Sequence, residues 1–132
     1  METNRMIFIV DDNPSDIELT TIALEAMGRE IVIRSATNGK SALAMLRNGL
    51  GVPDVMLLDM KMPGMSGIEV LREIRADYRI RELPVVVVTS SALESDKTEA
   101  LAAGATDYIQ KPLALAQFSR DLESILSRLL PN

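Results

Sequence analysis

Short apolar segments alternate with longer amphipathic segments along the whole chain. The apolar segments predict five β-strands, over residues 6–10, 30–35, 54–58, 85–88 and 107–110. The segment 85–88 consists of four valines without polar alternation, which is typical of a central strand in a parallel sheet. Helical spacing is clearest near the end of the chain, in an apolar stripe formed by Leu115, Phe118, Leu122, Ile125 and Leu129.

Local capping signals place a helix after each strand. Asn13 is a suitable N-cap and Pro14 a suitable first helical residue, and this helix is expected to end near Met27, before Gly28. The other helices are expected over 41–47, around 68–74, from between 91 and 95 to 103, and over 115–129. Five strands that alternate with five helices predict an α/β fold, in which right-handed crossovers place helices on both faces of a parallel sheet.

The composition is that of an ordinary globular domain, and it excludes several kinds of chemistry. Hydrophobic residues make up 47% of the chain and charged residues 25%, which argues against disorder. The net charge of −5 argues against a nucleic-acid-binding face, since such a face needs clustered Lys and Arg. The sequence has no cysteine, which excludes disulfides and thiol catalysis. It has no histidine, so it holds neither a phosphohistidine nor a Ser-His-Asp triad nor an imidazole metal ligand.

No segment has the character of a targeting or membrane-spanning sequence. The apolar run 6–10 is too short for the core of a signal peptide, and no run approaches the roughly 18 apolar residues of a membrane span. We therefore expect a cytoplasmic location. No repeat or linker divides the sequence, and residues 1–132 are expected to form a single domain without an appended output domain.

Polar side chains follow directly after four of the predicted strands. They are Asp11 and Asp12, then Asp59, then Thr89 and Ser90, and finally Lys111. Because the carboxyl ends of parallel strands meet at one edge of a sheet, we expect these side chains to share one crevice.

Three clustered carboxylates repel one another unless a cation lies among them. Oxygen ligands without His or Cys favour a hard ion, Mg²⁺ before Mn²⁺ or Ca²⁺. A carboxylate can also attack phosphorus and form an aspartyl phosphate, whose oxygens the metal, Lys111 and Thr89 could stabilise. The set therefore suits phosphoryl transfer.

Each of these residues also has a plainer explanation when it is taken alone. Asp59 could form a turn, and Thr89 could satisfy a backbone group at the end of its strand. Met60, Met62 and Met65 could fill gaps in the core, or they could rim a surface for a partner. Four such coincidences at the same sheet edge are improbable, which favours the chemical interpretation.

Along essentially its whole length, the sequence resembles the response-regulator receiver domains of two-component signalling. The matching segments are "VDDN", "LLDMKMPGMSG", "VVVVTSS" and "DYIQKP". The segments "DDNPSD" and "RADYRIRELP" are similar to those of single-domain receivers that partner phytochrome-type sensor kinases. The resemblance implies a five-stranded parallel sheet in the flavodoxin-like order 2-1-3-4-5. It also implies a stand-alone phosphoacceptor of a histidine-to-aspartate phosphorelay.

The resemblance implies that Asp59 is the phosphoacceptor. Asp12, Asp59 and the backbone carbonyl of Lys61 would bind Mg²⁺ directly, and Asp11 would bind it through a water molecule. Lys111 would pair with the phosphoryl group.

Further roles follow from the same resemblance. The Lys111–Pro112 peptide is expected to be cis. Thr89 and Tyr108 would form a switch, in which the hydroxyl of Thr89 turns toward the phosphoryl group and the ring of Tyr108 moves inward. Lys61 and Ser91 occupy positions that are variable in the family and tune its kinetics.

The partners implied by the resemblance are proteins. A sensor histidine kinase or a histidine phosphotransfer protein would donate the phosphoryl group. A downstream target would bind the face made of the fourth helix, fifth strand and fifth helix, and the resemblance is also compatible with a homodimer. No nucleic acid or membrane is implied. The domain would catalyse its own phosphorylation and slow dephosphorylation rather than turn over an external substrate.

Two alternatives from other classes share part of this pattern. A phosphohydrolase of the haloacid dehalogenase kind would need an acid two residues after Asp59, where Lys61 stands. A flavodoxin-like cofactor binder would need a phosphate-cradling loop rich in Ser, Thr and Gly after the first strand. Two acids, Asp11 and Asp12, stand there instead.

Overall fold

The computed structural model describes residues 5–49, 51–111 and 114–130. Five parallel strands form its central sheet in the order β2-β1-β3-β4-β5, which confirms the expected topology. The strands are β1 (Arg5–Val10), β2 (Ile31–Ala36), β3 (Val55–Leu58), β4 (Val85–Thr89) and β5 (Asp107–Gln110).

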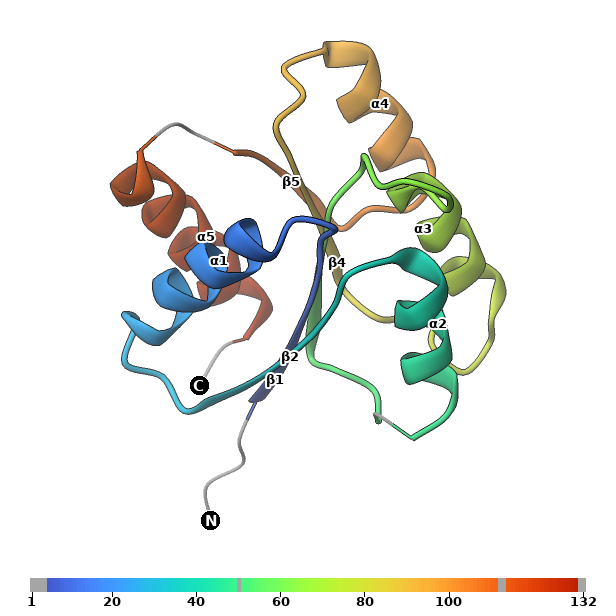
Figure 1. Cartoon of the computed structure of the whole chain (residues 1–132), viewed down its shortest axis with the longest axis horizontal. Helices are drawn as coiled ribbons and strands as arrows, with labels where there is room; N and C mark the ends of the chain where they lie inside the picture. The colour runs from blue at the N-terminus through green and yellow to red at the C-terminus, as the bar shows by residue number, and fades with distance from the viewer. Residues whose placement is uncertain (1–4, 50, 112–113, 131–132) are drawn as a thin grey trace.

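Helices cover both faces of the sheet (Figure 1). One face packs against α1 (Pro14–Glu25) and α5 (Leu115–Leu129). The other packs against α2 (Gly39–Arg47), α3 (Gly67–Ala76) and α4 (Glu94–Ala102). Among the helices of the described ranges, none combines the length and the apolar content that a membrane crossing requires.

The alternation of side chains along the central strands divides the interior into two cores. In β3, Val55 and Leu57 pack on the side of α1 and α5, whereas Met56 and Leu58 pack on the side of α2 and α3. Every residue of β4 is buried, as its run of valines predicts for a central parallel strand. The sheet is therefore fixed from both faces, and its strand ends are held in a defined register.

The helix boundaries differ from the predicted ones by one or two residues, for identifiable reasons. The helix α1 ends at Glu25 rather than near Met27. The helix α2 begins at Gly39, two residues early, because Asn38 caps it by accepting a hydrogen bond from the Ser41 N–H at 2.7 Å. A Cβ atom at position 39 would lie 2.5 Å from Cγ2 of Val70, so only glycine allows this close approach of α2 to α3.

The amphipathic stripe of α5 is confirmed except at its first residue. Phe118, Leu122 and Ile125 are buried, and Leu129 packs against the same core. The assignment of Leu115 to the buried face is wrong, because 42% of this residue is exposed at the first position of the helix.

Arg75 connects α3 to the loop that precedes β4 and to the loop that precedes β5. Its Nε donates a hydrogen bond to the carbonyl of Gly104 at 2.9 Å. Its Nη1 donates to the carbonyls of Arg81 and Leu83, at 2.8 and 2.7 Å. One guanidinium therefore satisfies three backbone acceptors that no regular element pairs.

Replacement of Arg75 by alanine should lower the free energy of unfolding by about 1.5–3 kcal/mol, because it leaves carbonyls without donors and removes a charged hydrogen-bonding group. Urea denaturation measures the change. Arg72→Ala is the matched control on the same helix, since the side chain of Arg72 is 63% exposed. That control should change stability by less than about 0.5 kcal/mol, and equal losses in both variants would contradict the assigned role of Arg75.

Candidate functional site

The sheet extends its hydrogen bonding one residue beyond β1 and β3, and this places two acids side by side. The N–H of Asp59 donates to the carbonyl of Val10 at 2.9 Å. The N–H of Asp11 donates to the carbonyl of Ala36 at 3.2 Å. The carboxylates of Asp11, Asp12 and Asp59 each offer an oxygen within 4.8 Å of the other two. The structure thus brings the three predicted metal-binding acids together.

The three carboxylates differ in their exposure to solvent. Asp11 and Asp59 are 5% and 7% exposed, whereas Asp12 is exposed. Burial raises the pKa of Asp59 to about 6, with Lys111 lowering it and the negative charge of Asp11 raising it. The backbone N–H of Lys61 also lowers this pKa by bonding to the carboxylate. Asp59 is therefore mostly ionised at neutral pH, but in an environment that disfavours its charge.

Lys111 supplies the positive charge of the site. Its Nζ donates hydrogen bonds to Oδ2 of Asp11 and to Oδ2 of Asp16, both at 2.8 Å. Burial lowers the pKa of Lys111, but these two hydrogen bonds and the negative charges of Asp59 and Asp11 together outweigh it and the pKa is raised, so the ammonium stays charged. The predicted cis peptide between Lys111 and Pro112 lies outside the described residues.

Asp16 is a site residue that the sequence reasoning missed. It lies in the first turn of α1, where an acid is ordinarily explained by the helix dipole. The segment "DDNPSD" contained the only available signal, because one helical turn returns Asp16 to the sheet edge near Asp11.

Thr89 and Tyr108 both contact Ser91. Thr89 is fully buried, and its Oγ1 accepts a hydrogen bond from the N–H of Ser91 at 3.2 Å. The hydroxyl of Tyr108 donates to the carbonyl of Ser91 at 3.2 Å. Ser91 in turn donates its Oγ–H to Oδ2 of Asp96 at 2.5 Å. The two predicted switch residues are therefore linked through a residue that was predicted only to tune kinetics.

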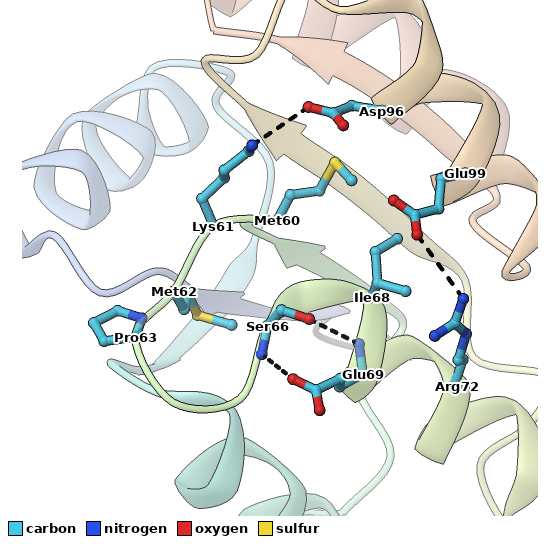
Figure 2. Close-up of a pocket in the computed structure, with 10 residues that line it drawn as sticks. All are labelled: Met60, Lys61, Met62, Pro63, Ser66, Ile68, Glu69, Arg72, Asp96 and Glu99. Carbon is cyan, nitrogen blue, oxygen red and sulfur yellow. Dashed lines mark hydrogen bonds and ion pairs between the residues drawn. The ribbon is translucent and has the colours of Figure 1, made fainter.

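Lys61 lies on the rim of a groove of about 600 Å³ between the β3–α3 loop and α4 (Figure 2). Its side chain points across the groove, and its Nζ lies 3.5 Å from Oδ2 of Asp96. The pair Arg72–Glu99 crosses the same groove at 4.0 Å. The expected influence of Lys61 on kinetics stays a prediction, but its partner in this structure is a residue of α4.

The loop that follows Asp59 is fixed by close packing and by a cap. The N–H of Gly67 donates to the carbonyl of Met60 at 2.9 Å, and a Cβ atom at position 67 would lie 2.2 Å from the carbonyl oxygen of Asp59. Ser66 and Glu69 form a capping box, in which the side chain of each bonds to the backbone N–H of the other (Figure 2). The start of α3 therefore holds the backbone of Asp59 in place.

The methionines of this loop belong mainly to the core. Met60 and Met62 are 5% and 7% exposed and pack with the α2 and α3 side of the sheet. Met65 is partly buried against the same cluster. Their burial supports the gap-filling interpretation for Met60 and Met62, although both also line the groove beside Lys61, so a contribution to a partner surface stays a prediction.

The raised pKa of Asp59 makes a prediction for stability. The pKa is higher in the folded state than the ordinary value near 3.8, so ionisation of Asp59 destabilises the fold increasingly as pH rises through 6. In buffer with a metal chelator, Asp59→Asn should raise the free energy of unfolding at pH 7.5, by at most about 2–3 kcal/mol. The gain should shrink toward pH 4. Urea denaturation at both pH values checks this, and an equal gain at both would contradict the buried-charge explanation.

Comparison with known protein families identifies the chain. The family model described as response regulator receiver domain matches residues 7–123. Chemotaxis protein CheY-3 of Vibrio cholerae is 36% identical over 129 residues, which cover 98% of this chain and 97% of that protein. Sensor histidine kinase CheAY of Helicobacter pylori is 35% identical over 107 residues, which cover 81% of this chain but 13% of the kinase. Similar sequences thus occur both as nearly whole proteins and as small parts of larger ones.

Solved structures agree with this relationship. The phosphorylated cyanobacterial phytochrome response regulator RcpA superimposes with a TM-score of 0.90 at 31% identity, covering 98% of this chain and 96% of that one. The Mn²⁺-bound form of response regulator Rcp1 gives a TM-score of 0.85 at 27% identity, covering 97% and 96%. Neither the phosphohydrolase nor the flavodoxin-like alternative is favoured by these matches. The chain belongs to the response regulator receiver domain family, the phosphoacceptor switches of two-component signalling.

Proposed function

We propose that Asp59 accepts a phosphoryl group from a phosphohistidine in a Mg²⁺-dependent reaction, and that the modification changes a protein-binding face. The observation that carries this proposal is the convergence at the strand ends. Three carboxylates lie within 4.8 Å of one another, and the ammonium of Lys111 lies 2.8 Å from one of them. Receiver domains are signalling switches, and this arrangement supports the same role here.

The residues at the strand ends fit a hard divalent cation. All the donors are oxygens, and the exposed Asp12 leaves one side of the cluster open to water, as Mg²⁺ prefers. Asp12, Asp59 and the carbonyl of Lys61 would hold the ion, with Asp11 acting through a water molecule. When bound, the ion would neutralise the carboxylates and the phosphoryl oxygens.

The proposed transfer is a displacement at phosphorus. An oxygen of the Asp59 carboxylate forms the new bond, the bond between phosphorus and the imidazole nitrogen breaks, and the electron pair stays on that nitrogen. The chain has no histidine, so the donor is another molecule, a sensor histidine kinase or a histidine phosphotransfer protein. A pKa of about 6 keeps Asp59 largely ionised, and therefore nucleophilic, at neutral pH.

Phosphorylation would be transmitted through the contacts of Ser91. Lys111 would extend to a phosphoryl oxygen, and the hydroxyl of Thr89 would turn from the Ser91 N–H toward the same group. The hydroxyl of Tyr108, which donates to the carbonyl of Ser91, would then lose this hydrogen bond, and the ring would move inward. This sequence couples the site to the neighbouring ends of α4 and β5.

The face formed by α4, β5 and α5 is the proposed binding surface for a target or a second copy of the chain. Three apolar residues of α4 and α5 or their caps are exposed, Leu93 at 61%, Leu101 at 44% and Leu115 at 42%. Isolated exposed leucines are common, but these belong to the two helices that precede and follow the strand of Tyr108 in the chain. CheY-3 is one relative that consists almost entirely of the shared domain.

Phosphorylation should occur at Asp59 and require its carboxylate. Incubation of the protein with acetyl phosphate and Mg²⁺ should add one phosphoryl group, stable to acid and labile to base, as measured by intact-mass spectrometry. Asp59→Asn should abolish the adduct, whereas Asp121→Asn, on the middle of α5, should not. Persistence of the adduct in Asp59→Asn would refute the proposal.

Labelling should depend on Mg²⁺ through Asp12. Asp12→Ala should slow labelling by at least about tenfold at subsaturating Mg²⁺, because it removes one direct ligand of an open site. It should not unfold the protein, since it relieves repulsion among the carboxylates. Glu18→Ala, an exposed acid of α1, is the control. Thermal denaturation with and without Mg²⁺ gives a second measurement, in which the parent is stabilised by the ion and the Asp12 variant is not.

Lys61 should slow the loss of the phosphoryl group. A long cation beside the aspartyl phosphate can pair with its oxygens and obstruct the line of water attack, and an ammonium cannot accept a hydrogen bond from that water. Lys61→Asn should therefore lose the label several-fold faster at saturating Mg²⁺, and Lys97→Asn, an exposed cation of α4, should match the parent. Equal or slower loss in Lys61→Asn would show that Lys61 does not obstruct the attack of water on the aspartyl phosphate.

A further inference from the structure

Two ion pairs cross the groove between the β3–α3 loop and α4. Lys61 pairs with Asp96 at 3.5 Å, and Arg72 pairs with Glu99 at 4.0 Å (Figure 2). The two acids are three residues apart on α4, so they face the groove from successive turns of the same helix. The groove thus offers two chemically similar contacts, of which only one involves the loop that carries Asp59.

The helix α4 has little apolar anchorage of its own. Within its nine residues, all of which the structure describes, Ala100 is the only buried one. Its N-cap residue, Leu93, makes no side-chain capping hydrogen bond. Charged contacts across the groove therefore contribute a larger share of its placement than they do for the well-buried α3.

Asp96 is the fixed member of its pair and Lys61 the adjustable one. The side chain of Asp96 is 18% exposed and that of Lys61 is 65% exposed. The hydrogen bond from Ser91 is the largest cause that lowers the pKa of Asp96, and the charge of Lys61 lowers it further. Ser91 thus holds the carboxylate in position, and the long lysine side chain reaches to it.

The ammonium of Lys61 is held across the groove rather than over Asp59. The charges that act on the pKa of Asp59 are those of Lys111, Asp11 and Asp12, whereas Lys61 acts on it through its backbone N–H. The cation is close in sequence to Asp59, yet its electrostatic partner is on α4.

We propose that Asp96 is a positioning residue for the chemistry at Asp59, because it competes with the phosphoryl group for the ammonium of Lys61. The inference rests on the proposed phosphorylation of Asp59. In the unmodified protein Asp96 draws the ammonium toward α4. After phosphorylation, the oxygens of the phosphoryl group carry more negative charge than one carboxylate and attract the same cation.

The competition affects the hydrolysis of the aspartyl phosphate. In that step a water oxygen bonds to phosphorus, and the bond from phosphorus to the Asp59 oxygen breaks with its electron pair returning to the carboxylate. The two protons of the water stay on the phosphate oxygens, and dihydrogen phosphate leaves. Lys61 obstructs the water only while it is paired with the phosphoryl group. Asp96 therefore shortens the lifetime of the modification by drawing Lys61 away from it.

Asp96→Asn is the discriminating variant. Its amide keeps the shape of the side chain and an oxygen that can accept from Ser91, but it removes the charge that pairs with Lys61. The phosphoryl lifetime should lengthen by up to about fivefold, the range expected for a half-exposed ion pair. Glu99→Gln breaks the neighbouring pair on the same helix and should leave the lifetime unchanged.

A double-mutant cycle shows whether Asp96 acts through Lys61. In the Lys61→Asn background, Asp96→Asn should change the lifetime no further, because the cation for which Asp96 and the phosphoryl group compete is gone. An unchanged or shorter lifetime in the Asp96→Asn single variant would overturn the proposal. So would a lengthening that persists without Lys61, because it would reflect a general effect on α4.

A second measurement uses the unphosphorylated, metal-free protein. The ¹⁵Nζ signal of Lys61 in NMR spectra should shift and exchange faster in Asp96→Asn, and it should stay unchanged in Glu99→Gln. No change in Asp96→Asn would show that the pair does not hold Lys61 in solution. This readout stands apart from the labelling of Asp59, so failure of the inference is separable from failure of the proposed function.

Discussion

The mutual repulsion of three carboxylates is the constraint around which the site is built. Hydrogen bonds that continue the sheet past β1 and β3 hold the backbones of Asp11 and Asp59 side by side, and their carboxylates lie close together. Burial, with a smaller contribution from the negative charges of Asp11 and Asp12, raises the pKa of Asp59, and the clustered carboxylates favour whatever cation can enter. The sheet, stabilised by two apolar cores, therefore holds an arrangement that the acids alone would not adopt.

Lys111 offsets part of this repulsion without removing it. Its ammonium bonds to Asp11, which follows β1, and to Asp16 of α1. Because these bonds do not include Asp59, the carboxylate on that residue keeps its lone pairs for another partner. A site in which Lys111 neutralised Asp59 directly would be more stable and less reactive, since a tightly paired carboxylate is a poorer nucleophile.

The sequence predicted the parts of the site that follow from strand direction. Asp11, Asp59, Thr89 and Lys111 were identified because each follows a strand, and parallel strands end at a common edge. Asp16 and Asp96 were missed because their roles depend on where helices lie relative to that edge, which the spacing of apolar residues does not fix. The pairing of Lys61 with α4 was hidden for the same reason.

The two helices that border the groove are anchored in opposite ways, and this difference decides which one can respond. The helix α3 begins with a capping box, and Gly67 packs on the backbone of Asp59, so the start of α3 moves only if Asp59 moves. The helix α4 buries one alanine and depends on ion pairs. A new charge nearby can draw a side chain out of an exposed ion pair. It does not rearrange a close contact between backbone atoms. On the proposed mechanism, a charge added at Asp59 would therefore act on α4, beside Ser91 and Tyr108, while the backbone at the start of α3 stays in place.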